Sequence, residues 1–210
     1  DLSFFHGRGG TASRGGGRTE RAVMAAPHGS VNGHLRLTEQ GEVIHRKYAI
    51  RAIALRNIEQ AFSGLLHATL NPLPPDPREP AWRASMARIA QVSRDSYREL
   101  VYGEQAFAEY FRAATPIDVI ERMKIGSRPS LRKGDVFRIE QLRAIPWVFA
   151  WSQSRHGLPG WFGLGSGLEA VCREQGEERI AEMARDWPFF RLLLEDVEMV
   201  LAKGDADGRL

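Results

Sequence analysis

The sequence has a single cysteine, no long apolar run and little net charge. Cys172 alone cannot form an internal disulfide or a cysteine-based zinc cluster, which fits a reducing compartment. The longest strongly apolar run, residues 144–151, is far shorter than the roughly 18–20 residues that span a bilayer. A net charge of +3 provides no overall basic field for nucleic acid. We therefore expect a cytoplasmic protein whose partners include neither a membrane nor a nucleic acid.

The composition favours one globular domain. Hydrophobic residues make up 43% of the 210 residues and charged residues 26%, so the chain can bury a core. The chain starts with Asp1 and enters an apolar segment at once. We therefore expect a fragment of a longer protein.

Short β-prone segments alternate with longer helical patterns. In the helical pattern of residues 42–70, Ile44, Tyr48, Ala52, Leu55 and Ile58 recur at spacings of three or four. Residues 80–100 and most residues after 158 are also helical in pattern, with breaks at Gly176 and at the start signal 186–188. Because parallel strands need crossovers, this alternation favours an α/β fold that is strongly helix-dominated. The predicted strands are residues 2–6, 34–38, 123–127 and 144–151.

A loop rich in glycine and arginine follows the first predicted strand. Residues 7–18 contain six glycines and three arginines, and such backbone can converge on a phosphate or carboxylate. A flexible surface loop is the plain alternative. The string "GRGGTA" also matches a Rossmann fingerprint, and "GRGG" resembles an RNA-binding segment. A P-loop is excluded because no Gly-Lys-Ser/Thr follows.

Two further cationic points lie beside later predicted strands. Residues 125–135 hold Arg128, Arg132 and Lys133, which form either a solvated basic turn or part of an anion site. Arg143 directly precedes the apolar run 144–151, and a buried arginine needs an anionic partner. Glu39 precedes the helical pattern of residues 42–70, where helix capping is the simplest role. The histidines show no metal-ligand spacing.

Taken together and in order, nine segments resemble the phosphoenolpyruvate carboxylase family. Several are long and unusual, and they span nearly the whole chain. They are "FHGRGGT" (5–11), "RGGG" (14–17), "GSVNGHLRLTEQGEVI" (29–44), "YFRAATP" (110–116), "GSRP" (126–129), "LRAIPWVFAWSQSR" (142–155), "LPGWFGLG" (158–165), "DWPFF" (186–190) and "EMVLAK" (198–203).

The resemblance implies a carboxy-lyase that joins phosphoenolpyruvate and bicarbonate, with Mg²⁺ or Mn²⁺, to give oxaloacetate and phosphate. This reaction feeds carbon into the tricarboxylic acid cycle. The implied fold is a partial (β/α)8 TIM-type barrel, with residues 1–210 forming its later strands and their helices. The N-terminal part and the extreme C-terminus of the enzyme would be missing. The full enzyme would be a homotetramer that aspartate or malate inhibits.

The resemblance also implies roles for individual residues. The catalytic residues would be His6, Arg8 and Arg14. Arg8, Arg128 and Arg143 would bind the substrate, and Arg132 and Lys133 would belong to a mobile loop. Arg14 and Lys203 would contact the allosteric inhibitor.

Some features depart from the family's pattern. Arg18 stands where the glycine loop normally continues with proline, and residues 130–141 lack the usual paired glycines. The family's metal ligands, second catalytic histidine and active-site lysine are expected upstream of this chain. We therefore expect the fragment alone to be inactive. The alternative is an inert remnant or a standalone anion-binding module.

Overall fold

The computed structural model describes residues 19–27, 29–39, 41–72, 74–123 and 139–204. About 75% of these residues are helical, and none of them forms a strand. The prediction of an α/β fold with a partial (β/α)8 barrel is therefore wrong for the part of the chain that the structure describes. None of the described helices is both long and apolar enough to cross a bilayer.

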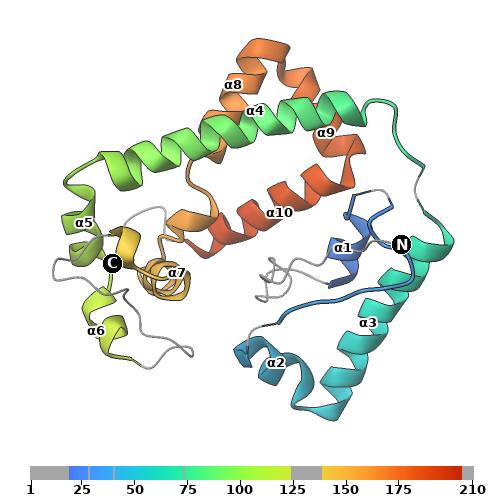
Figure 1. Ribbon diagram of the computed structural model, residues 1–210, viewed down its shortest axis with the longest axis horizontal. Coiled ribbons are helices and arrows are strands. Elements are labelled where there is room, and N and C mark those ends of the chain that lie inside the picture. The colour runs from blue at the N-terminus through green and yellow to red at the C-terminus, as the bar shows by residue number, and fades with distance from the viewer. Residues whose placement is uncertain (1–18, 28, 40, 73, 124–138, 205–210) are drawn as a thin grey trace. The chain divides into compact units, whose positions relative to one another are not determined.

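Figure 1 shows the helices of the described residues and the loops that connect them. In this part of the chain, three 3-10 or π turns, labelled η, lie between the helices. The elements are α1 (Thr19–Met24), α2 (Gly41–Tyr48), α3 (Arg51–Leu70), α4 (Glu79–Arg98), η2 (Glu99–Gly103), α5 (Phe107–Ala114), α6 (Ile117–Arg122), η3 (Ile139–Gln141), α7 (Ala144–Gln153), η4 (Leu158–Gly160), α8 (Leu164–Gln175), α9 (Glu177–Asp186) and α10 (Pro188–Lys203).

The four predicted strands have different outcomes. Residues 2–6 and 124–127 lie outside the described residues, and Met123 is the extended C-cap of α6. Residues 34–38 have no regular secondary structure and no strand partner among the described residues. Residues 144–151 form most of α7, so that strand prediction is wrong.

The sequence of α7 shows why the strand prediction failed. An apolar run of eight residues fits a buried strand and a buried helix equally well. Pro146 is tolerated because it lies in the first helical turn, where backbone N–H groups have no intrahelical acceptor. Trp147 and Trp151 lie one turn apart, with ring centroids separated by 5.7 Å. This helical spacing buries Pro146, Ala150 and Trp151 together.

The chain divides into two compact units. Unit 1 consists of Asp1–Pro80 and Glu182–Asp196, and unit 2 consists of Ala81–Ala181 and Val197–Leu210.

In unit 1, α3 packs against α1. A Cβ added at Gly64 would lie 2.9 Å from the Cα of Glu20, so glycine permits this close approach. The predicted single helix over residues 42–70 is interrupted at Ile50, whose extended backbone (φ −104°, ψ 122°) precedes α3. Trp187 stacks on Phe190 in the same unit, with centroids 6.4 Å apart.

Unit 2 has an aromatic core. Trp151 lies at its centre, with ring centroids 6.0 Å from Phe107, 5.3 Å from Phe111 and 5.7 Å from Trp147. Aliphatic side chains from α6, η3 and η4 complete this core, which therefore joins segments far apart in sequence. The buried members are Val101, Phe107, Phe111, Ile117, Ile120, Ile139, Leu142, Ala150, Trp151 and Leu158.

Two glycines at the start of α8 allow it to approach α4 closely. A Cβ at Gly163 would lie 2.4 Å from the backbone oxygen of Ser93, and one at Gly167 would lie 2.5 Å from that of Ile89. Gly163 also has φ +93°, a conformation that side chains disfavour. The "LPGWFGLG" segment therefore has a packing role.

The turn that follows α7 contains a strained residue. Arg155 has φ 59°, and a left-handed conformation costs a non-glycine residue roughly 1–2 kcal/mol. Glycine would relieve this strain but would lose about 0.5–1 kcal/mol through its freer unfolded state. We expect Arg155→Gly to raise the free energy of unfolding by about 0.5–1 kcal/mol, measured by urea denaturation. Arg155→Ala keeps the strain and serves as the control; an equal gain in both variants would contradict the explanation.

Candidate anion-binding site

Two of the predicted site residues lie in the described part of the chain. Arg143 is the N-cap of α7, and Lys203 is the last residue of α10. Both belong to unit 2. The remaining predicted site residues lie outside the described residues, and their roles stay predictions: His6, Arg8, Arg14, Arg128, Arg132 and Lys133.

Arg143 is held at a defined point of the backbone. The preceding turn η3 buries Ile139, and Leu142 is also buried in the aromatic core of unit 2. The carbonyl oxygen of Arg143 accepts a hydrogen bond from the N–H of Trp147 at 3.1 Å, in the first turn of α7. The core on one side and the helix on the other therefore fix the Arg143 backbone.

The side chain of Arg143 carries a buried donor. Its Nε is buried and has no hydrogen-bond partner among the described residues. Leaving such a donor unsatisfied costs about 1–3 kcal/mol, or more for a charged group. The N-terminus of α7 adds the positive end of a helix dipole beside it. An anion bound here would supply the acceptor that the described residues do not.

Lys203 lies in a different setting. Its side chain is exposed at the C-terminal end of α10, where a cation interacts favourably with the helix dipole. It is therefore accessible to a solute. Its role as an inhibitor contact stays a prediction.

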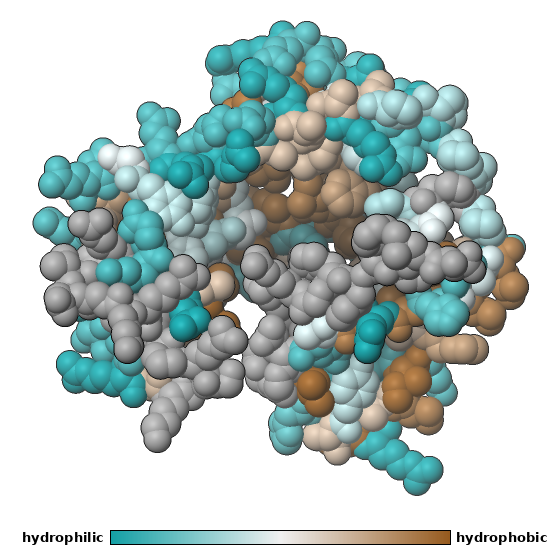
Figure 2. All heavy atoms as spheres, viewed as in Figure 1, coloured by the Kyte–Doolittle hydropathy of each residue, from teal (hydrophilic) through white to brown (hydrophobic). Residues whose placement is uncertain are grey.

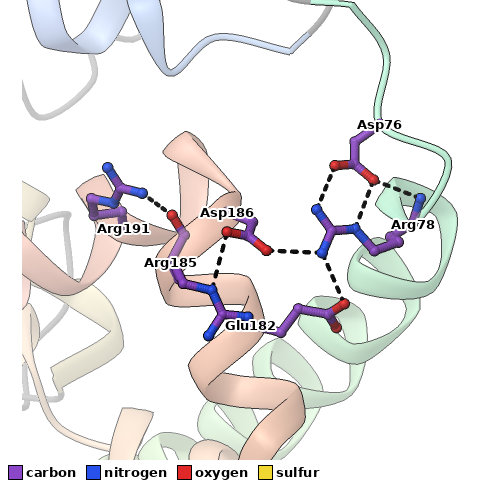
Figure 3. A network of polar contacts seen from close by, with 6 residues as sticks. All are labelled: Asp76, Arg78, Glu182, Arg185, Asp186 and Arg191. Atoms are coloured by element: carbon purple, nitrogen blue, oxygen red, sulfur yellow. Dashed lines mark hydrogen bonds and ion pairs between the residues drawn. The ribbon is translucent and has the colours of Figure 1, made fainter.

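The most extensive polar network in unit 1 surrounds Arg78 (Figure 3). Its guanidinium donates two hydrogen bonds to Asp76, from Nη2 at 2.8 Å and Nε at 3.0 Å. Nη1 donates to Asp186 at 2.8 Å and to Glu182 at 3.2 Å. These contacts fasten the segment before α4 to the last residues of α9.

The charge of Arg78 is matched by these carboxylates. Hydrogen bonds from its guanidinium hold the pKa values of Asp76 and Asp186 below their usual range. The same contacts raise the pKa of Arg78. Because three carboxylates already surround this guanidinium, we interpret the network as structural.

A buried ion pair in unit 1 was not predicted from the sequence. Lys47 Nζ lies 2.7 Å from Glu39 Oε1, and both side chains are about nine-tenths buried. Glu39 therefore has a partner beyond the predicted helix-capping role. The eight-residue separation of the pair follows no helical or strand spacing, so no local pattern could have revealed it.

The described residues do not fit a divalent metal. No group of three or more His, Cys, Asp or Glu side chains in this part of the chain could hold one. Mg²⁺ prefers carboxylate and other oxygen ligands, and the carboxylates around Arg78 are occupied by its guanidinium. We assign no metal site to these residues.

Comparisons with known proteins agree on one family. The family model described as phosphoenolpyruvate carboxylase matches residues 1–207. The phosphoenolpyruvate carboxylases of Xanthomonas campestris pv. campestris and Xanthomonas euvesicatoria pv. vesicatoria are each 59% identical to this chain over 204 residues. These matches cover 97% of this chain and 22% of each relative. The Shewanella sediminis phosphoenolpyruvate carboxylase is 46% identical over 204 residues, 97% of this chain and 23% of that protein.

The match covers almost all of this chain, while the chain spans only about a fifth of the length of these curated relatives. The resemblance seen in the ordered motifs is therefore confirmed. The chain belongs to the phosphoenolpyruvate carboxylase family.

Proposed function

We propose that this chain supplies part of the phosphate-binding surface of a phosphoenolpyruvate carboxylase. The observation that carries the proposal is the buried Nε of Arg143, which has no acceptor among the described residues. It lies where the N-terminus of α7 also favours negative charge. Membership of the family makes phosphoenolpyruvate the anion we propose for it.

The reaction explains why a fixed guanidinium would be useful. A bicarbonate oxygen attacks the phosphorus of phosphoenolpyruvate, and the bond from phosphorus to the enol oxygen breaks, giving carboxyphosphate and an enolate. Negative charge is spread over the transferring phosphoryl group, and preorganised cations stabilise it. Carboxyphosphate then releases CO₂ and phosphate, and the enolate carbon attacks CO₂ to give oxaloacetate. We propose that Arg143 binds the phosphoryl oxygens during the first step.

Other residues enter this proposal through the resemblance alone. Arg8 and Arg128 would join Arg143 on the substrate, while His6 and Arg14 would lie at the reacting centre. The segment holding Arg132 and Lys133 would exclude water from the enolate and CO₂. Lys203, with Arg14, would contact aspartate or malate. The family's Mg²⁺ or Mn²⁺ finds no ligand set among the described residues, so no step is assigned to it here.

We propose that turnover belongs to the longer polypeptide. The chain corresponds to 22% of the length of its relatives in Xanthomonas, so it would provide only some of the groups that the reaction needs. A homotetramer is likewise proposed for the whole enzyme. Binding of an anion at Arg143 without turnover, even within the longer polypeptide, would instead agree with the alternative of an anion-binding module.

Arg143→Ala tests the proposed contact. The variant is made in a chimera, in which this chain replaces the matching segment of the Xanthomonas campestris relative. Truncating one member of a buried charge pair costs about 2–4 kcal/mol, so we expect phosphoenolpyruvate affinity to fall by about 30-fold to 900-fold. Equilibrium binding of phosphoenolpyruvate measures the effect directly.

Two further variants act as controls. Arg143→Lys keeps the charge but loses the planar, two-pronged geometry, so we expect an intermediate loss of affinity. Arg173→Ala removes an exposed arginine on α8 that pairs with Glu169, and it should leave binding unchanged. Wild-type affinity in Arg143→Ala would remove Arg143 from the substrate site.

A further inference from the structure

The helix α3 carries several large apolar side chains on a solvent-exposed face. Five of these side chains are between 45% and 67% exposed. They lie three or four residues apart and so form one continuous line along the helix, which we name the α3 stripe. Its members are Leu55, Ile58, Phe62, Leu66 and Leu70.

The α3 stripe lies opposite the face that packs against α1. At 3.6 residues per turn its members cover an arc of about 120°. Gly64, which contacts Glu20 of α1, lies about 180° from Leu55 on the same helix. The face that packs against α1 is therefore centred on Gly64, while the α3 stripe is left exposed. Figure 2 shows hydrophobic side chains at the surface over α3.

A continuous apolar line of this kind is atypical of a free surface. Amphipathic helices normally turn their apolar face to a core and their polar face to water. Single exposed apolar residues are common, but five large ones in line along one helix face are characteristic of a face that packs against another element. The stripe should therefore be covered when the protein is complete.

The dimensions of the stripe decide which partner is suitable. From Leu55 to Leu70 it is about 22 Å long and about 10 Å wide, or roughly 200 Å². A stable dimer buries about 800 Å² on each partner, so the stripe alone is too small to hold two copies together. Packing within one polypeptide needs no such area, because the covalent connection removes the entropic cost of association.

We propose that the α3 stripe is an internal packing surface, covered by the rest of the same carboxylase polypeptide. The relatives supply the length that this requires, since the chain accounts for only 22% of the Xanthomonas proteins. The covering segment must present a complementary apolar face. The proposal rests on family membership and not on the role of Arg143, so the two can fail separately.

Cysteine labelling of the stripe tests this proposal. Phe62→Cys is made in a Cys172→Ala background, both in the 210-residue chain and in the chimera described above. Reaction with a maleimide is followed by mass spectrometry of the peptide that contains position 62. We expect rapid labelling in the chain and labelling at least tenfold slower in the chimera. Arg56→Cys, at an exposed position off the stripe, should react rapidly in both proteins.

Three outcomes would overturn the proposal. Rapid labelling of Phe62→Cys in the chimera would show that the stripe stays exposed. Slow labelling in the isolated chain would show that the chain covers the stripe itself or through a second copy. Protection that disappears when chimera subunits are dissociated by dilution would assign the stripe to contacts between subunits. Leu70→Cys, at the far end of the helix, repeats the test if Phe62→Cys fails to fold.

Discussion

Gly163→Ala is expected to lower the free energy of unfolding by about 2–5 kcal/mol, because two penalties add at this position. The added Cβ would lie 2.4 Å from the backbone oxygen of Ser93, and overpacking costs about 1–3 kcal/mol. The residue would also have to adopt φ +93°, or shift away from it. The oxygen belongs to the rigid helix α4, so α8 itself must move.

Urea denaturation followed by circular dichroism measures this loss, and Gly165→Ala is the matched control. Gly165 lies two residues further along, within α8, and an added Cβ there meets nothing within 4 Å. Alanine is the better helix former by about 1 kcal/mol, so Gly165→Ala should be neutral or stabilising. If the two variants lose stability equally, the close approach of α8 and α4 does not explain the effect.

Trp151→Ala is expected to cost about 3–5 kcal/mol, as other large-to-small core substitutions of aromatic residues do. Trp151 is completely buried, and its ring lies within 6.3 Å of those of Phe107, Tyr110, Phe111 and Trp147. Removal of the indole leaves a cavity. Either α5 and α7 stay in place around this cavity, or they move inward and fill part of it. The loss of near-ultraviolet circular dichroism with urea measures the change.

Trp151→Phe separates ring packing from the indole N–H. The Nε1 of Trp151 is buried and has no hydrogen-bond partner among the described residues, so phenylalanine loses no hydrogen bond. We expect Trp151→Phe to cost much less than Trp151→Ala. Equal losses would show that the volume of the indole, and not an aromatic ring as such, holds the core together.

Helical periodicity and its start and stop signals gave the most reliable predictions from the sequence. Residues 80–100 predicted a helix, and α4 runs over Glu79–Arg98 with Trp82 and Ile89 buried on one face. The predicted break at Gly176 is confirmed, since this glycine has φ +87° between α8 and α9. The start signal at residues 186–188 is followed by α10. Glycine and proline determine these boundaries locally, so the sequence alone reveals them.

Tertiary features could not be predicted in this way. The run 144–151 has the composition of a strand and of a buried helix, and only packing around Trp151 distinguishes them. The spacing of Leu55 and Ile58 predicted a helix correctly but not their exposure. Periodicity shows which face of a helix is apolar; it does not show what covers that face. The Lys47–Glu39 pair likewise depends on how the chain folds back.

The candidate site was predictable in part. Arg143 was identified because a cation precedes an apolar segment, and its buried Nε agrees with that reasoning although the segment is a helix. The glycine-rich loop with His6, Arg8 and Arg14 lies outside the described residues, so its chemistry stays a prediction. The family itself followed from motif order, which needs no knowledge of the fold.

The division of the chain into two units has an optical consequence. Trp187 is the only tryptophan of unit 1, whereas Trp82, Trp147, Trp151 and Trp161 all belong to unit 2. Replacing Trp187 with phenylalanine would leave an emission spectrum that reports on unit 2 alone. Subtracting this from the parent spectrum would give the signal of unit 1, so each half of the chain carries its own fluorescent reporter.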